Sequence, residues 1–164
     1  MKPPASNTFD AMQEIKALNK IPLDKNFVKK YDNIEAAFKK TAKEQGVQDY
    51  DNKIAAKLIK DSVIIELKKY FNRPTPKVSA KKMNVNMKDI EMASMKTASY
   101  PSGHSVQGIL IGKVLSDKYP QAKSAFKKTA ENISYSRRVA RAHYKSDSDM
   151  GEKLGIAMYD HIKK

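Results

Sequence analysis

Apolar residues recur every three or four positions along most of the chain, which is the spacing of one face of an α-helix. The pattern predicts helices over residues 9–18, 24–45, 51–71, 105–118, 121–141 and 149–162. The helix over 51–71 carries the densest apolar face, so we expect it to be central. Alternating strand patterns of useful length do not appear. The sequence therefore predicts an all-α fold, a bundle of about six or seven helices.

Because no repeat or low-complexity linker divides residues 1–164, we expect one domain.

Residues 72–100 interrupt the helical pattern. Pro74 and Pro76 end the preceding helix, because proline lacks the amide hydrogen and crowds the previous turn. The rest of the segment is polar and rich in methionine, so it is predicted to be a long loop with about one helical turn. Its methionines either fill gaps over the core or contact a substrate, and the first interpretation is favoured. They are Met83, Met87, Met92 and Met95.

Composition excludes several classes of protein. The 164 residues contain no cysteine, which excludes a disulfide scaffold, a thiol nucleophile and a cysteine-ligated metal. Neither a secretory signal nor a run of roughly 20 apolar residues is visible, so we expect a soluble, cytoplasmic protein. The net charge is +14, but the lysines are dispersed in pairs along the chain, as on solvated helix faces. Specific nucleic-acid binding is therefore not expected.

One candidate anion site is the string Pro101-Ser102-Gly103-His104, at the start of a predicted helix. The first amides of a helix are unpaired and lie at the positive end of its dipole. Gly103 lets an anion approach the backbone, and Ser102 adds a hydroxyl group. His104 could donate a proton near neutral pH. The competing interpretation is an ordinary Ser-Gly helix cap followed by a surface histidine.

A second group consists of Ser136-Arg137, His143 and Asp147. The guanidinium of Arg137 suits a phosphoryl group. The four-residue interval lets the carboxylate of Asp147 hold one imidazole nitrogen of His143, which leaves the other nitrogen free as a nucleophile. A helix-stabilising His–Asp pair on a basic surface is the alternative.

The combination resembles the superfamily of soluble acid phosphatases, type 2 phosphatidic acid phosphatases and vanadium haloperoxidases. Its signature is Lys, six residues, Arg-Pro; then Pro-Ser-Gly-His; then Ser-Arg, five residues, His, three residues, Asp. The second and third parts are intact in this chain, and 31 residues separate them. The resemblance covers roughly residues 64–154.

The first part of the signature departs from the family pattern. Taking Lys68 as the family lysine at the usual spacing puts Thr75-Pro76 at the Arg-Pro position, and taking Arg73-Pro74 as the pair puts Glu66 at the lysine position. A glutamate would repel a phosphate. A spacing shortened by two residues keeps both Lys68 and Arg73, and we prefer it. A lysine pair that closes a helix is the alternative.

The resemblance implies a phosphatase that acts on soluble monoesters, such as nucleotides or sugar phosphates, without a metal or other cofactor. His143 would attack phosphorus and form a phosphohistidine, Asp147 would orient His143, and His104 would be the general acid and base. The phosphoryl oxygens would be held by Lys68, Arg73, Ser102, Gly103 and Arg137. Vanadate could occupy the phosphate site as an inhibitor.

Two alternatives remain open at this stage. One is a non-catalytic module that binds phosphate or nucleic acid, and the other is a vanadate-dependent haloperoxidase. Oligomeric state and substrate identity cannot be read from the sequence, and His161 receives no role.

Overall fold

The computed structural model describes residues 1–6, 8–59 and 62–164, which are mostly helical and include no strand. The all-α prediction is therefore confirmed. The elements are α1 (Phe9–Asn19), α2 (Lys25–Asp32), α3 (Ile34–Glu44), α4 (Asn52–Leu58), α5 (Ser62–Phe71), α6 (Pro76–Lys82), η1 (Ala93–Lys96), α7 (Gly103–Lys118), η2 (Pro120–Ala122), α8 (Lys123–Val139) and α9 (Lys145–Lys163).

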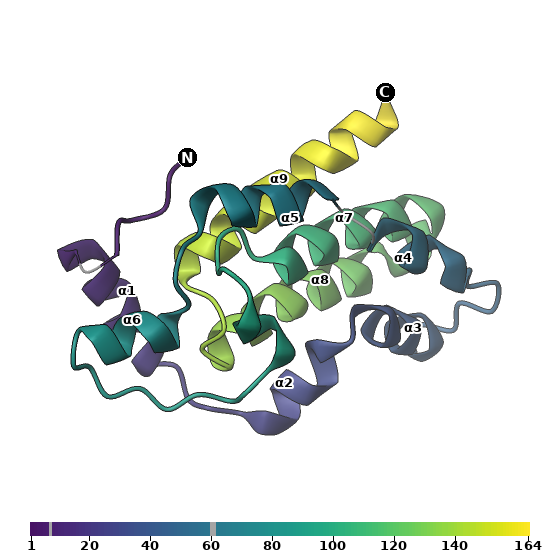
Figure 1. The fold of residues 1–164 in the computed structure, drawn as a ribbon. Helices are drawn as coiled ribbons and strands as arrows, with labels where there is room; N and C mark the ends of the chain where they lie inside the picture. Colours follow the sequence, from purple (N-terminus) through teal and green to yellow (C-terminus); the bar gives the residue numbers. More distant parts are fainter. Residues whose placement is uncertain (7, 60–61) are drawn as a thin grey trace.

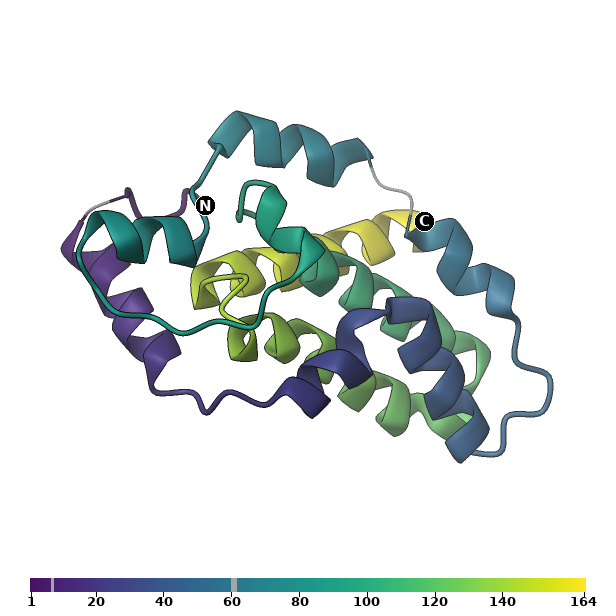
Figure 2. The same cartoon turned by 60° about the horizontal axis from the view of Figure 1, so that its bottom comes forward.

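The central helix is α7, which packs against both α8 and α9 (Figures 1 and 2). The main apolar cluster joins α7 to α8 and to α3. It includes Phe38, Ile111, Leu115, Phe126 and Ile133, whose side chains are fully buried.

The prediction that residues 51–71 form the central helix is wrong. The segment contains α4 and α5, and residues 60 and 61 lie outside the described part of the chain. Of the residues of α5, Ile64 is buried, whereas Val63 and Ile65 are about half exposed. Apolar residues therefore lie on several faces of α5, and Figure 2 shows this helix at the edge of the molecule. Apolar density alone did not reveal which face is buried.

The predicted helix over 24–45 is two helices, α2 and α3, that meet at Asn33. Asn33 has extended backbone angles (φ −90°, ψ 110°), and its side chain accepts a hydrogen bond from the amide of Ala36. An asparagine that caps a new helix in this way ends the preceding one. The break leaves the last residue of α2, Asp32, with an exposed side chain.

The segment 72–100 contains more helix than predicted, because α6 lies within it. Pro76 occupies the start of α6, where a missing amide hydrogen costs nothing. Beyond α6 the chain runs as a long loop across the molecule to η1 (Figure 2). The methionines of this loop pack on two small buried clusters, which confirms their interpretation as core filling.

Two glycines bring α9 against α7. A Cβ atom at Gly151 would lie 2.6 Å from the carbonyl oxygen of Ser102, and one at Gly155 would lie 2.6 Å from that of Val106. Only glycine allows two backbones to approach so closely. This contact fixes the start of α9 beside the start of α7. Among the described residues, no helix is long and apolar enough to cross a membrane.

Candidate active site

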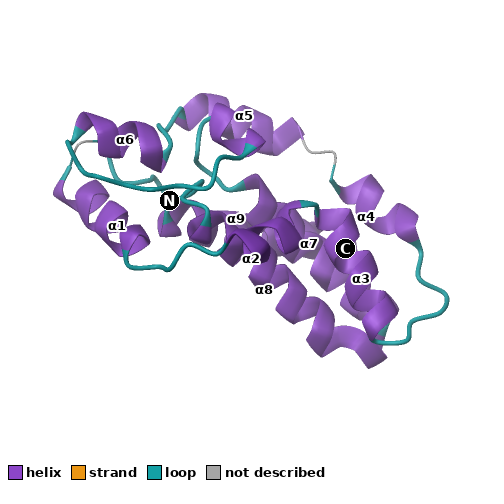
Figure 3. Ribbon diagram, turned by 90° about the horizontal axis from the view of Figure 1, so that it is seen from below, coloured by secondary structure: helices purple, strands orange, loops and turns teal. Residues whose placement is uncertain are grey.

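The second and third sequence motifs meet at one end of the helical core. Helices α7 and α8 follow one another and pack side by side, so the start of α7 lies beside the end of α8, and α9 begins there after a short turn (Figure 1). The backbone amide of Ser102 donates a hydrogen bond of 3.0 Å to the carbonyl oxygen of Asp147, which joins the two motifs directly. Figure 3 shows α2 alongside this end of the core.

The ring of His143 is buried, and its orientation is fixed by a backbone carbonyl. Nδ1 lies 2.7 Å from the carbonyl oxygen of Ser99 and 3.5 Å from Oδ2 of Asp147. A carbonyl oxygen can only accept, so Nδ1 carries the proton and a neutral ring has its lone pair on Nε2. Burial lowers the pKa of His143, against the opposing effect of Asp147. The ring is therefore neutral over a wider pH range than a free histidine.

Asp147 is fully buried, and its carboxylate contacts Arg73, Tyr144 and His143. Oδ1 accepts a hydrogen bond of 2.6 Å from Nη1 of Arg73, and Oδ2 accepts one of 2.8 Å from the amide of Tyr144. The predicted pairing with His143 is present at ion-pair distance, but Ser99 makes the shorter contact to the imidazole.

Arg73 is buried between two carboxylates. Nη1 bonds Asp147, and Nη2 lies 2.8 Å from Oε2 of Glu14 on α1. The guanidinium also lies 3.8 Å from the centre of the Tyr144 ring, a cation–π contact. The structure thus brings Arg73 to the site, with both Nη groups bonded to protein acceptors. Its predicted contact with a phosphoryl oxygen stays a prediction.

Arg137 is completely buried at the end of α8, and its guanidinium is partly satisfied. Nε donates to Oγ of Ser136 at 3.0 Å, and Nη1 lies 3.2 Å from Oδ1 of Asp32. No described residue bonds Nη2, which is buried. Burial lowers the pKa of Arg137, and Asp32 opposes that effect. A buried donor without a partner is costly, so this nitrogen is suited to an incoming anion.

His104 lies on the first turn of α7 and contacts the end of α2. Nε2 lies 2.9 Å from the carbonyl oxygen of Asp32, so this nitrogen carries the proton of the neutral ring. Burial and then the charge of Arg137 lower the pKa of His104 to about 4, and His143 adds to the effect. The pKa of His104 thus depends on the positive charge of Arg137 and on His143.

The start of α7 has the predicted helix-cap geometry. Oγ of Ser102 accepts from the amide of Ser105 at 3.3 Å and from its hydroxyl at 2.9 Å. A Cβ atom at Gly103 would meet only Ile64, at an ordinary 3.6 Å. The surrounding protein therefore does not require glycine at position 103.

Lys68, in the last turn of α5, donates to the carbonyl oxygen of Ala98 at 2.5 Å. Burial lowers the pKa of its ammonium, and the charge of Asp147 opposes this. Lys68 in turn lowers the pKa of His143. Lys68 therefore interacts electrostatically with His143, and the shortened spacing between Lys68 and Arg73 stays a prediction.

Sequence reasoning missed three residues that shape this site. Asp32 bonds Arg137 and His104, Glu14 bonds Arg73, and Ser99 holds His143. The Asp32-Asn33 pair is a recognisable helix-capping signal that could have revealed the break between α2 and α3. Ser99 acts through its backbone and Glu14 lies far away in sequence, so neither carries a local signal.

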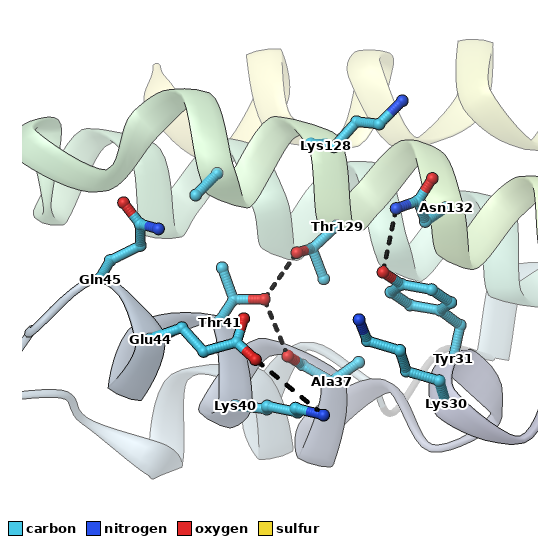
Figure 4. Close-up of a pocket in the computed structure, with 11 residues that line it drawn as sticks. Lys30, Tyr31, Ala37, Lys40, Thr41, Glu44, Gln45, Lys128, Thr129 and Asn132 are labelled. Atoms are coloured by element: carbon cyan, nitrogen blue, oxygen red, sulfur yellow. Dashed lines mark hydrogen bonds and ion pairs between the residues drawn. The ribbon is translucent and has the colours of Figure 1, made fainter. Parts of the chain in front are cut away.

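A separate pocket of about 180 Å³ lies between α3 and α8, with the end of α2 at one side (Figure 4). Four of its polar side chains bond in pairs: Thr41 to Thr129 at 2.6 Å, and Asn132 to Tyr31 at 3.0 Å. The lining contains no histidine, and Lys40 faces Glu44 at 4.0 Å. None of the motif residues lines this pocket, so the end of the helical core where the motifs meet remains the better candidate site.

No protein-family model matches the chain. Two curated proteins match part of the chain, and each is named "Non-specific acid phosphatase". The protein of Salmonella typhimurium strain LT2 is 31% identical over 96 residues, and that of Salmonella typhi is 30% identical over 96 residues. Each match covers 58% of this chain and 38% of the relative, so the chain spans about two fifths of the relatives' length. Over more than half of its own length, the chain is similar to non-specific acid phosphatases.

Proposed function

We propose that this protein is a phosphatase that hydrolyses phosphate monoesters through a phosphohistidine intermediate. The proposal rests on two features of one site: the oriented ring of His143 and the unbonded nitrogen of Arg137. The carbonyl of Ser99 holds the proton of His143 on Nδ1, which leaves a nucleophilic lone pair on Nε2. In the same site, Arg137 has a buried Nη2 that no described residue bonds. The similarity to proteins named acid phosphatases supports the same reaction class.

In the first step, Nε2 of His143 forms a bond to phosphorus while the bond from phosphorus to the leaving oxygen breaks. His104 gives its proton to that oxygen. In the second step, a water molecule attacks phosphorus, His104 takes a proton from this water, and the phosphorus–nitrogen bond breaks. Phosphate leaves and both histidines regain their starting states.

The phosphoryl oxygens are held by cationic and backbone donors, which neutralise charge in the transition state. We assign this role to Arg137, Lys68, the amide of Gly103 and the hydroxyl of Ser102. Asp147 stabilises the positive ring of His143 in the intermediate. Arg73, bonded to Asp147 and Glu14, holds that carboxylate in place.

The low pKa of His104 has a consequence for the pH dependence of the reaction. In the empty site the ring is neutral above about pH 4, whereas a general acid must be protonated. A phosphoryl dianion between Arg137 and His104 would favour the charged imidazole and raise its pKa. We therefore expect the highest activity on the acid side of neutrality.

The proposed substrates are small soluble monoesters such as nucleotides and sugar phosphates, and the reaction needs no metal ion. The test is phosphate release from a panel of monoesters, with and without a chelator. Turnover should be lost in His143→Ala and kept in His161→Ala, because His161 is exposed near the end of α9. Full activity of His143→Ala would overturn the mechanism. Phosphate binding without turnover of any monoester would favour a binding module instead.

A further inference from the structure

Asp32 is an acidic residue that lies beside Arg137 and His104, at the exposed edge of the site. It ends α2 at the break before Asn33, and its side chain is 58% exposed. An acidic group so close to a phosphate site weakens phosphate binding by charge repulsion. Its presence therefore calls for a role.

The contacts of Asp32 place it beside the reacting groups. Its carboxylate lies 3.2 Å from Nη1 of Arg137, and its backbone carbonyl accepts from Nε2 of His104 at 2.9 Å. The carboxylate is also 3.9 Å from the same His104 nitrogen. One residue thus touches both the phosphoryl-binding arginine and the proposed general acid.

The carboxylate can keep its place when substrate binds. Arg137 uses Nη1 for Asp32 and Nε for Ser136, but its Nη2 is bonded by no described residue. A phosphoryl oxygen can therefore take Nη2 without displacing Asp32. The carboxylate then remains at the exposed edge of the site, next to His104.

We propose that Asp32 is a specificity-determining residue that faces the leaving group of the substrate. This inference rests on the proposed function, in which His104 protonates the leaving oxygen, so that the leaving group lies beside His104. A carboxylate there accepts hydrogen bonds from hydroxyl groups and attracts an ammonium group. It repels a leaving group that carries a carboxylate or a second phosphate. The preferred substrates are monoesters of uncharged, hydroxyl-bearing or cationic alcohols.

The test compares substrates that differ in the charge of the leaving group. Glycerol 3-phosphate and 3-phosphoglycerate are of similar size, and the second adds one carboxylate. The native enzyme should prefer glycerol 3-phosphate in kcat/KM by about three- to tenfold, the range expected for one partly screened like-charge contact. In Asp32→Asn this ratio should fall to about one to two, and the preference for O-phosphoethanolamine should fall as well.

The control is Asp160→Asn, which removes the same charge from an exposed position on α9. It should leave the ratio of the two kcat/KM values unchanged. If Asp32 merely orients Arg137 and His104, Asp32→Asn lowers kcat/KM for both substrates equally, and the unchanged ratio overturns the inference. Failure of the native enzyme to release phosphate from any monoester would instead overturn the proposed function itself.

Discussion

The proposed role of the Gly103 amide can be tested with little disturbance of the fold. A methyl group at this position would meet Ile64 at an ordinary distance, so Gly103→Ala should fold with unchanged thermal stability. In the proposed mechanism this amide binds a phosphoryl oxygen, which the added methyl group would crowd. Because the loss of one such donor costs about 10²- to 10³-fold, kcat should fall by at least tenfold. Steady-state kinetics beside a thermal melt measure both quantities, and a fully active, stable variant would remove Gly103 from the site.

A second prediction concerns the contribution of Arg73 to stability. It is 4% exposed and lies 2.6 Å from the fully buried Asp147. Replacing it with methionine leaves that carboxylate buried without its cation, which should lower the free energy of unfolding by about 3–5 kcal/mol. Urea denaturation gives this value.

The matched control for Arg73→Met is Lys69→Met, which breaks an exposed pair with Glu66 on the neighbouring turn. That loss should be at most about 1 kcal/mol. Equal losses of unfolding free energy in the two variants would show that Arg73 does not stabilise the buried carboxylate of Asp147.

The proximity of the residues in the second and third motifs could be predicted from the sequence. His104, Arg137, His143 and Asp147 are near one another in the structure, as the motif spacing implied. Partners that act across the fold could not be predicted. Asp32 reaches Arg137 over 105 positions, and the contact exists only because α2 ends where it does. The predicted His143–Asp147 contact is also longer than the unpredicted one to Ser99.

The position of the site depends on how closely α9 approaches α7. A Cβ atom at Gly155 would lie 2.6 Å from the backbone oxygen of Val106 and 3.0 Å from Cβ of Ile109. Gly155→Ala should therefore push the helices apart and destabilise the protein by about 1–3 kcal/mol. Chemical denaturation measures the loss, with Ala157→Ser on an exposed position of the same helix as control. A stability equal to that of the native protein would contradict this packing.

Helical periodicity predicted most of the elements and erred where capping residues intervene. The repeat of apolar residues continues through residues 24–45, but Asn33 ends one helix and begins the next. The prolines after α5 were correctly expected to end it, while Pro76 was not expected to begin α6. The spacing of apolar residues alone does not distinguish a proline that ends one helix from a proline that begins the next.

For the whole molecule, burial of neutral histidines links stability to pH. The pKa of His104 falls to about 4 in the folded protein, so the unfolded chain binds more protons between about pH 6.5 and 4. The stabilisation is complete above pH 6.5 and is lost as the pH falls toward 4. At pH 5 the loss from His104 should be about 2 kcal/mol, and the lowered pKa of His143 adds to it.

Urea denaturation at pH 7 and pH 5 measures this linkage. His104→Asn should lose less stability over the interval than the native protein, because position 104 then no longer titrates. Identical losses in the two proteins would contradict the buried, neutral state of His104. Since the proposed reaction needs a protonated His104, the acid conditions expected to favour it also destabilise the protein without phosphate. Bound phosphate should offset part of that loss.

The proposed covalent step at His143 can be tested directly by trapping the intermediate. p-Nitrophenyl phosphate has a leaving group that departs without protonation, so in His104→Ala the first step should proceed and the second should stall. After an alkaline quench, which preserves phosphohistidine, mass spectrometry should find one phosphoryl group on the peptide containing His143. The double variant His104→Ala, His143→Ala should carry none. Release of p-nitrophenol with the phosphoryl group on another residue, or with no adduct at any time, would contradict the proposed mechanism.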